Sequence, residues 1–175
     1  MTAPLRIEHA ALADARAVAQ IHVDAWRTAY ASILPADFLA RLSVDTREAM
    51  WREVIEADDP ELLVARDGDV VRGWINVGAC RDEGASAIDG EIWALYVAPD
   101  AWSSGAGRAL WLRGRERLIA RGCTACSLWV FPDNARAIRF YRAAGFVADP
   151  LPHKSFELGG TTLQEARYSC TLLPH

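Results

Sequence analysis

Hydrophobic positions in the first third of the chain follow a helical period. A short strand pattern at residues 5–8 comes first, and a helical pattern over residues 14–30 follows it, with Asp14 as a possible cap. A second helical region covers residues 35–56 and is broken near residues 43–45. The chain is therefore expected to begin with one strand and two helical regions.

After residue 60 the pattern changes to that of strands. Residues 61–66, 70–79 and 90–97 predict three strands, and the Asp-Gly-Asp turn at residues 67–69 predicts a hairpin between the first two. We expect these strands to form an antiparallel meander.

The remainder of the chain alternates helix and strand. A helix is predicted at residues 106–120, a strand at 126–130 and a second helix at 134–144, and each helix is followed by a glycine that ends it. Closing strands are predicted at 146–148, 155–158 and 167–173, around a Gly-Gly turn. Together these patterns predict an α/β fold with a mixed sheet.

Composition limits the size of the fold and the kinds of partner. With 51% hydrophobic residues, a chain of 175 residues can bury one sizeable core, so we expect residues 1–175 to form a single domain. The formal net charge of −4 argues against nucleic acid as a partner. No apolar run approaches the roughly 18 residues of a membrane helix, so we expect no membrane partner and a cytoplasmic location.

The cysteines carry a weaker signal. Cys123 and Cys126 have the spacing of a redox or zinc site, but no second close pair of Cys or His accompanies them. Buried free thiols are the simpler interpretation, and we predict no metal site. A redox role would require an exposed thiolate with a depressed pKa.

The segment 91–110 carries the strongest functional signal. A strand breaks at Pro99, and a helix begins after a loop of small residues at 103–105 and 107. Such a loop leaves backbone N–H groups open next to a helix N-terminus, which predicts an anion cradle suited to a pyrophosphate. The segment lacks the Gly-Lys-Ser/Thr of a P-loop, and Leu110 stands where the dinucleotide fingerprint needs a third glycine.

This segment resembles the coenzyme A-binding motif of the GCN5-related N-acetyltransferase (GNAT) superfamily, in which a strand ending in Val-x-Pro is followed by Arg/Gln-x-x-Gly-x-Gly/Ala. The matching positions are Val97, Pro99, Gly105 and Gly107. The run 128–134 and the segment 137–146, which ends in Phe-Tyr-Arg-Ala-Ala-Gly-Phe, are similar to the family's second cofactor motif. The order of predicted elements is also that of the superfamily and covers nearly all of the chain.

The resemblance implies an N-acetyltransferase that moves an acetyl group from acetyl-CoA, as cosubstrate, to a primary amine of a small molecule or peptide by direct attack on the thioester. It implies a mixed, mostly antiparallel central sheet flanked by helices. It also implies a set of cofactor-binding residues: Leu95, Tyr96, Val97, Trp102, Ser103, Ser104, Gly105, Ala106, Gly107, Arg108, Asn134 and Ala137.

Two positions depart from the family pattern. Trp102 stands where Arg or Gln is usual, and Ser103 stands where a further glycine is common. One expected polar contact to the pyrophosphate is therefore missing, although backbone amides of residues 103–108 remain to bind it. Arg108 adds local positive charge.

Glu91 is the predicted general base. With Trp93, Leu95 and Val97 it is expected to share one face of a central strand, where a carboxylate is anomalous. In a partly desolvated pocket its pKa would rise and it would accept the ammonium proton of the acceptor, as matching acidic residues do in many family members. The alternative is a carboxylate at an exposed strand end. By resemblance, a backbone N–H near Val97 would meet the oxyanion.

Tyr141 is the predicted general acid. Asn134, Ala137 and Tyr141 lie on one face of the predicted second helix, which can line a cofactor. The resemblance places Tyr141 near the thioester sulfur, where it would protonate the leaving thiolate. The alternative is an aromatic side chain that only packs in the core.

His22, Trp26 and Tyr30 recur every fourth residue on the first predicted helix. By resemblance this helix borders the acceptor pocket, where a cationic amine over Trp26 or Tyr30 would gain about 0.5–2 kcal/mol. The alternative is that two of the three pack in the core and His22 lies on an ordinary polar face.

Other functions stay open at this stage. A non-catalytic acyl-CoA-binding sensor or interaction domain is possible on the same fold, although the presence of both Glu91 and Tyr141 argues against it. The acceptor can be a polyamine, an amino acid, a drug amine, or a protein N-terminus or lysine. A homodimer is expected because family members often pair through their C-terminal strands.

Overall fold

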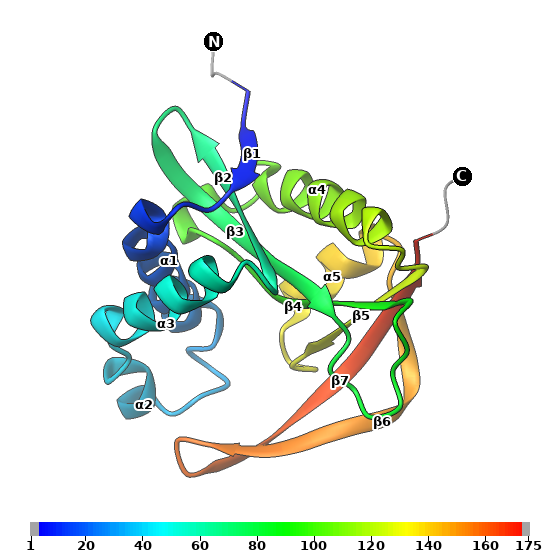
Figure 1. Ribbon diagram of the computed structural model, residues 1–175. Coiled ribbons are helices and arrows are strands. Elements are labelled where there is room, and N and C mark those ends of the chain that lie inside the picture. The colour runs from blue at the N-terminus through cyan, green and yellow to red at the C-terminus, as the bar shows by residue number, and fades with distance from the viewer. Residues whose placement is uncertain (1–3, 173–175) are drawn as a thin grey trace.

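The computed structural model describes residues 4–172, and a seven-stranded sheet forms its centre (Figure 1). The strand order is β1-β2-β3-β4-β5-β7-β6, and β4 with β5 is the one parallel pair in this sheet. The strands are β1 (Arg6–His9), β2 (Glu61–Asp67), β3 (Val70–Ala79), β4 (Asp89–Val97), β5 (Ala125–Val130), β6 (Val147–Leu158) and β7 (Thr161–Thr171). The prediction of a mixed, mostly antiparallel sheet is confirmed.

Helices cover both faces of the sheet. The helices α1 and α3 pack together on one face, and α4 and α5 lie on the other (Figure 1). The helices are α1 (Ala15–Ala29), α2 (Ala36–Ala40), α3 (Val44–Ala57), α4 (Ala106–Ala120) and α5 (Ala135–Ala143). Ser43 accepts a hydrogen bond from the Thr46 N–H at 3.2 Å and so caps α3, which explains the predicted break near residues 43–45. Within residues 4–172, no helix is long and apolar enough to cross a membrane.

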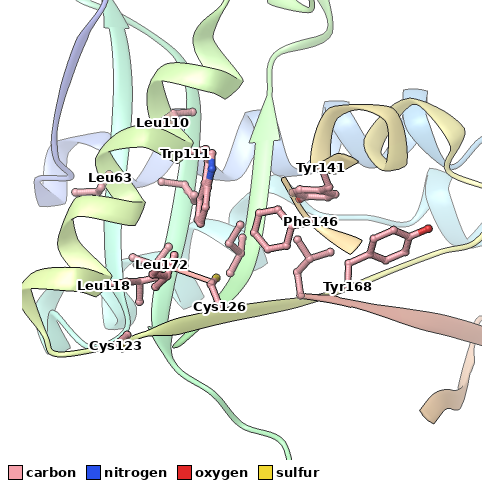
Figure 2. Packing of buried hydrophobic residues seen from close by; sticks show 14 of the residues in the cluster. Leu63, Leu110, Trp111, Leu118, Cys123, Cys126, Tyr141, Phe146, Tyr168 and Leu172 are labelled. Carbon is pink, nitrogen blue, oxygen red and sulfur yellow. The ribbon is translucent and has the colours of Figure 1, made fainter. Parts of the chain in front are cut away.

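The largest buried cluster lies between the sheet and the α4–α5 layer. In it Phe146 makes ring contacts with Trp111 and Tyr141, at centroid distances of 5.0 and 5.7 Å (Figure 2). A second cluster lies under α1 and α3, where Trp51 and Trp74 meet at 4.5 Å. The two faces of the sheet are therefore buried by different sets of side chains.

An irregularity in β4 decides which side chains reach each face. The pairing of β3 with β4 shifts by one residue, which leaves Trp93 as an extra residue in β4. Glu91 pairs with Gly78, and Leu95 pairs with Ile75. Because these two partners are three residues apart on β3, Glu91 and Leu95 lie on opposite faces of the sheet. The prediction that they share one face is wrong, because a β-bulge cannot be read from a simple alternation.

The strands β4 and β5 separate along their length. Their parallel ladder joins residues 89–91 to residues 125–127, whereas β4 continues beside β3 as far as Val97. Beyond the ladder, residues 92–96 of β4 and 128–130 of β5 line a common cavity. The separation therefore opens the sheet at its centre.

The β6–β7 hairpin closes this region from the side of α2 (Figure 1). At its tip, a Cβ on Gly159 would lie 2.9 Å from the Cβ of Phe38, so the hairpin and α2 are in close contact. Leu163 of β7 belongs to the same buried cluster as Tyr30. The predicted strands at 146–148 and 155–158 are parts of one long strand, β6.

Candidate functional site

Two cavities meet beside α5. The first, here called the aromatic cavity, has a volume of about 460 Å³ and is lined by nine aromatic side chains among others: His22, Trp26, Tyr30, Trp51, Trp93, Tyr96, Trp129, Phe131 and Tyr141. The second, here called the cleft cavity, has a volume of about 360 Å³ and is lined by Val97, Trp102, Ser103, Gly105, Arg108 and Phe140 among others. Both are also lined by Leu95, Arg136, Ala137 and Tyr141. Two ligands, one in each cavity, would meet at these shared residues.

The loop before α4 turns its backbone towards the cleft cavity. Gly105 is the N-cap residue of α4 and has a φ of 90°, which glycine adopts without strain. Ser103 has a φ of 62°, where the missing family glycine would be unstrained. The Ser104 hydroxyl accepts a hydrogen bond from the Ala106 N–H at 3.3 Å. The next N–H groups of α4, through Arg108, have no intrahelical acceptor, and the helix dipole favours an anion there.

Gly107 has a second role besides backbone access. A Cβ at this position would lie 3.2 Å from Cε2 of Phe140. Its absence lets α4 approach α5, which forms the other wall of the cleft cavity. The close approach of the two helices therefore depends on this glycine.

Trp102 does not replace the usual Arg or Gln as a ligand donor, because its Nε1–H donates to the Val97 carbonyl at 2.9 Å. Its ring instead makes a cation–π contact with the guanidinium of Arg136, which lies 3.5 Å from the ring centroid. Arg136 is the first arginine of α5 and lines both cavities, and Arg108 and Arg139 also line the cleft cavity. The positive charge that position 102 lacks is supplied from across the cleft.

The start of α5 places the other predicted cofactor residues. The Asn134 side chain accepts a hydrogen bond from the Ala137 N–H at 3.2 Å and so caps the helix. Asn134 lines the aromatic cavity, and Ala137 lines both cavities. Asn134 therefore positions α5, and its side-chain oxygen is engaged in doing so.

Tyr141 lies at the junction of the two cavities. Its side chain is buried, and its ring makes edge contacts with Phe140 and Phe146 in the main core. Figure 2 shows Tyr141 beside Phe146. Burial raises the pKa of Tyr141 well above the usual value, so the hydroxyl keeps its proton at neutral pH. The ring therefore packs in the core, and the residue also lines both cavities.

Glu91 is bound by Arg81, a contact that the sequence did not predict. Its side chain is 1% exposed, and the Arg81 guanidinium binds both of its oxygens at 2.6 and 3.2 Å. The Arg81 backbone N–H donates a third bond at 2.8 Å. Arg81 lines the aromatic cavity, and Glu91 is not among the residues that line it. This geometry does not support the prediction that Glu91 is free to accept a proton.

His22, Trp26 and Tyr30 all line the aromatic cavity. His22 is buried, and its Nδ1 accepts a hydrogen bond from Trp51 Nε1 at 3.1 Å. Burial, with the nearby charge of Arg47, lowers the pKa of His22 to about 3, so the ring is neutral. The alternative that His22 lies on an ordinary polar face is wrong, because the aromatic neighbours in the fold come from other segments.

Several charged residues of the aromatic cavity were not predicted. They are Arg47 on α3, Arg81 after β3, Arg136 on α5 and Glu165 on β7. They come from four separate segments, and nothing in their local sequence distinguishes them from surface charges. The hairpin contact with α2, which brings β7 to the cavity, is likewise not visible in the sequence.

The cysteine pair is inert in this environment. Cys123 and Cys126 are both buried, and burial raises the pKa of each thiol. This supports the interpretation as buried free thiols over a redox pair. Among the residues that the structure describes, no three His, Cys, Asp or Glu side chains are grouped as metal ligands.

The sequence and the fold were compared with known proteins. A model of the "Acetyltransferase (GNAT) family" matches residues 17–146. The uncharacterized N-acetyltransferase YuaI of Bacillus subtilis is 34% identical over 161 residues, which is 91% of this chain and 88% of YuaI. These matches extend from α1 to the end of α5 and beyond.

Two solved structures share the fold. The PaiA N-acetyltransferase of Thermoplasma acidophilum, solved with coenzyme A, aligns with a TM-score of 0.79 at 17% identity over 97% of this chain and 99% of its own. The Salmonella typhimurium protein yncA, solved with its cofactor acetyl-CoA, aligns with a TM-score of 0.73 at 23% identity over 99% of this chain and 96% of its own. At these identities the likeness concerns the fold.

Proposed function

Because this chain belongs to the acetyltransferase (GNAT) family, we propose that it is an N-acetyltransferase that moves an acetyl group from acetyl-CoA to an amine. The observation that carries the proposal is the junction of the two cavities at Leu95, Arg136, Ala137 and Tyr141. A cosubstrate in the cleft cavity and an amine in the aromatic cavity would meet there. Family members solved with coenzyme A or acetyl-CoA support the choice of cosubstrate.

The residues of the cleft cavity fit the phosphate groups of such a cosubstrate. The N-terminus of α4 offers backbone N–H donors next to Gly105, and Arg108, Arg136 and Arg139 surround the cavity with positive charge. This local charge is opposite in sign to the net charge of the chain, −4. An anionic ligand is therefore favoured in the cleft although the whole protein is acidic.

When bound, acetyl-CoA would supply the thioester whose carbonyl carbon the amine attacks. A C–N bond forms, the C–S bond breaks, and the nitrogen loses its proton to solvent. Tyr141 is the proposed donor of a proton to the thiolate, since it lines both cavities and keeps its proton at neutral pH. The proposed oxyanion donor is a backbone N–H of β4 near Val97, where β4 has left β5.

Transfer to an amine can be tested by measuring thiol release from acetyl-CoA in the presence of amino acids, polyamines, drug amines and peptides. We expect amine-dependent release by the wild-type protein. The competing function is a non-catalytic acyl-CoA sensor on the same fold. Acetyl-CoA binding without release on any amine would favour that sensor and would contradict the proposed transfer.

Cellular location and assembly are separate predictions. We propose a cytoplasmic enzyme and a homodimer formed through the C-terminal strands. Sedimentation of the purified protein would test the dimer, because a mass of 19.2 kDa at all concentrations would contradict it.

A further inference from the structure

The aromatic cavity carries both signs of charge. Three arginines line it, Arg47, Arg81 and Arg136, together with one carboxylate, Glu165. Arg81 is neutralised by Glu91, and Arg136 is stacked on Trp102 at the mouth of the cleft. Arg47 and Glu165 are the two charges left to meet an acceptor.

The acidic residues next to Arg47 in the sequence form ion pairs with another arginine. Asp45 and Glu48, beside it on α3, both bind Arg16. The guanidinium of Arg47 instead lies 5.7 Å from the ring centroid of Trp26, inside the wall of the cavity. Within residues 4–172, no carboxylate forms an ion pair with Arg47. Arg47 is half-buried, and an anionic ligand group would offset the cost of holding a partly desolvated cation without an anion.

Glu165 is unpaired because the lysine opposite it binds another carboxylate. Lys154 lies directly opposite it on β6. The ammonium group of Lys154, however, binds Asp82 at 3.1 Å and lies 4.1 Å from the ring centroid of Trp129. In the described part of the chain Glu165 has no hydrogen-bond donor, and burial raises its pKa. A ligand ammonium would supply the missing positive charge.

The two unpaired charges, Arg47 and Glu165, both act on the hydroxyl group of Tyr96. The Tyr96 hydroxyl shares a hydrogen bond of 3.1 Å with the Tyr30 hydroxyl in the wall of the cavity. Burial raises the pKa of Tyr96, and among the nearby charges Glu165 raises it while Arg47 lowers it. Both charges are therefore close to the same hydroxyl, within a cavity of about 460 Å³. That volume matches a small molecule.

We infer that the acceptor is a small amine that also carries an anionic group, as an amino acid does, with its ammonium group at Glu165 and its anionic group at Arg47. This inference rests on the proposed transfer to an amine and selects one class from the acceptors that the sequence left open. A polyamine is disfavoured, because two or more cations would enter a cavity lined by three arginines. The aromatic walls suit an apolar side chain on the acceptor.

The test compares acceptors that differ only in the anionic group. Phenylalanine, phenylalaninamide and 2-phenylethylamine form one series, and leucine, leucinamide and isopentylamine form another. Thiol release from acetyl-CoA gives kcat/KM for each compound. We expect the amino acid to exceed its amide and its decarboxylated amine by about tenfold or more in at least one series, which corresponds to one charge-assisted contact.

Two variants with matched controls locate the charges. Arg47→Gln is expected to remove the preference for the carboxylate, and Arg52→Gln, an exposed arginine on the same helix, is expected to keep it. Glu165→Gln is expected to raise KM for every amine, and Glu157→Gln, an exposed glutamate on β6, is expected to leave it unchanged. Calorimetric binding of acetyl-CoA by each variant serves as the check on folding and on the cleft.

The outcomes separate this inference from the proposed function. Equal or better turnover of the amides and decarboxylated amines in both series, or acetylation restricted to polyamines or peptides, would overturn the inference while the proposed function holds. A carboxylate preference that survives Arg47→Gln would also overturn it. Failure of the wild-type protein to bind acetyl-CoA would instead overturn the proposed function.

Discussion

Both carboxylate oxygens of Glu91 accept hydrogen bonds from the Arg81 guanidinium, and the Arg81 backbone N–H adds a third. Arg81 in turn lies 4.0 Å from the ring centroid of Trp93 and lines the aromatic cavity. Glu91 thus contacts a residue that lines the aromatic cavity, although Glu91 itself does not line it. Both oxygens of this carboxylate are therefore occupied by one arginine.

The first prediction concerns Glu91→Gln. We expect the free energy of unfolding to fall by about 1–3 kcal/mol, because charge-assisted hydrogen bonds to a buried group are lost. We expect the acidic limb of the kcat/KM pH profile to remain, since Arg81 occupies both oxygens of Glu91. Urea unfolding and the pH profile measure the two effects. Loss of that limb, with a fall in kcat of roughly a hundredfold or more, would restore Glu91 as the general base.

The second prediction concerns Tyr141→Phe. The substitution keeps the ring contacts with Phe140 and Phe146 and removes the hydroxyl. We expect kcat to fall by about tenfold to a hundredfold with a smaller change in KM. The matched control is Tyr168→Phe, a tyrosine buried in the same core that lines neither cavity. Equal kcat in the two variants would contradict the proposed role of Tyr141 as general acid.

The third prediction concerns the cation that faces Trp102. We expect Arg136→Gln to weaken acetyl-CoA binding by about tenfold or more, because one charge-assisted contact is worth roughly 1.5–3 kcal/mol. Arg142→Gln, an exposed arginine on the same helix, is expected to leave the affinity unchanged. Both dissociation constants can be measured by calorimetry. Unchanged affinity in Arg136→Gln would show that the arginine only packs on the indole.

The fourth prediction concerns pH and His22. Its pKa is lowered to about 3 in the folded protein, from the ordinary value of 6.5. A base whose folded pKa is lowered contributes full stability above about pH 6.5 and loses it as the pH falls towards about 3. We expect the free energy of unfolding to lose about 1.4 kcal/mol per pH unit in this window from this residue. Urea unfolding at several pH values measures the slope.

The control for that slope is His22→Asn, whose side-chain oxygen can still accept the bond from Trp51. This variant is expected to be less stable at neutral pH but to show a shallower dependence between about pH 6.5 and about pH 4. An identical slope in both proteins would mean that His22 is not the residue that titrates. Asp82, with a pKa lowered to about 2, acts at lower pH and does not confuse the comparison.

Local signals in the sequence predicted most of the fold. The Asp-Gly-Asp turn, the break near residues 43–45 and the glycines after α4 and α5 depend on residues within a few positions of each other, so the sequence alone predicts them. The cradle at Gly105 was predicted for the same reason. The bulge at Trp93 was not, because a bulge depends on how one strand pairs with another.

The charged residues of the aromatic cavity show the limit of local signals. Arg47, Arg81 and Glu165 stand in segments with ordinary surface patterns, and their importance depends on which partners other residues have already taken. That competition for partners exists only in the folded chain. The contact of Glu91 with Arg81 was not predicted for this reason, since the two residues lie on either side of a loop.

Calorimetric titration of the wild-type protein with acetyl-CoA tests the central claim most directly. We expect saturable binding of one equivalent per chain, with coenzyme A competing for the same site. Absence of binding up to about millimolar concentration, where the affinity is only about 4 kcal/mol, would contradict the claim that the cleft beside α4 holds the cosubstrate.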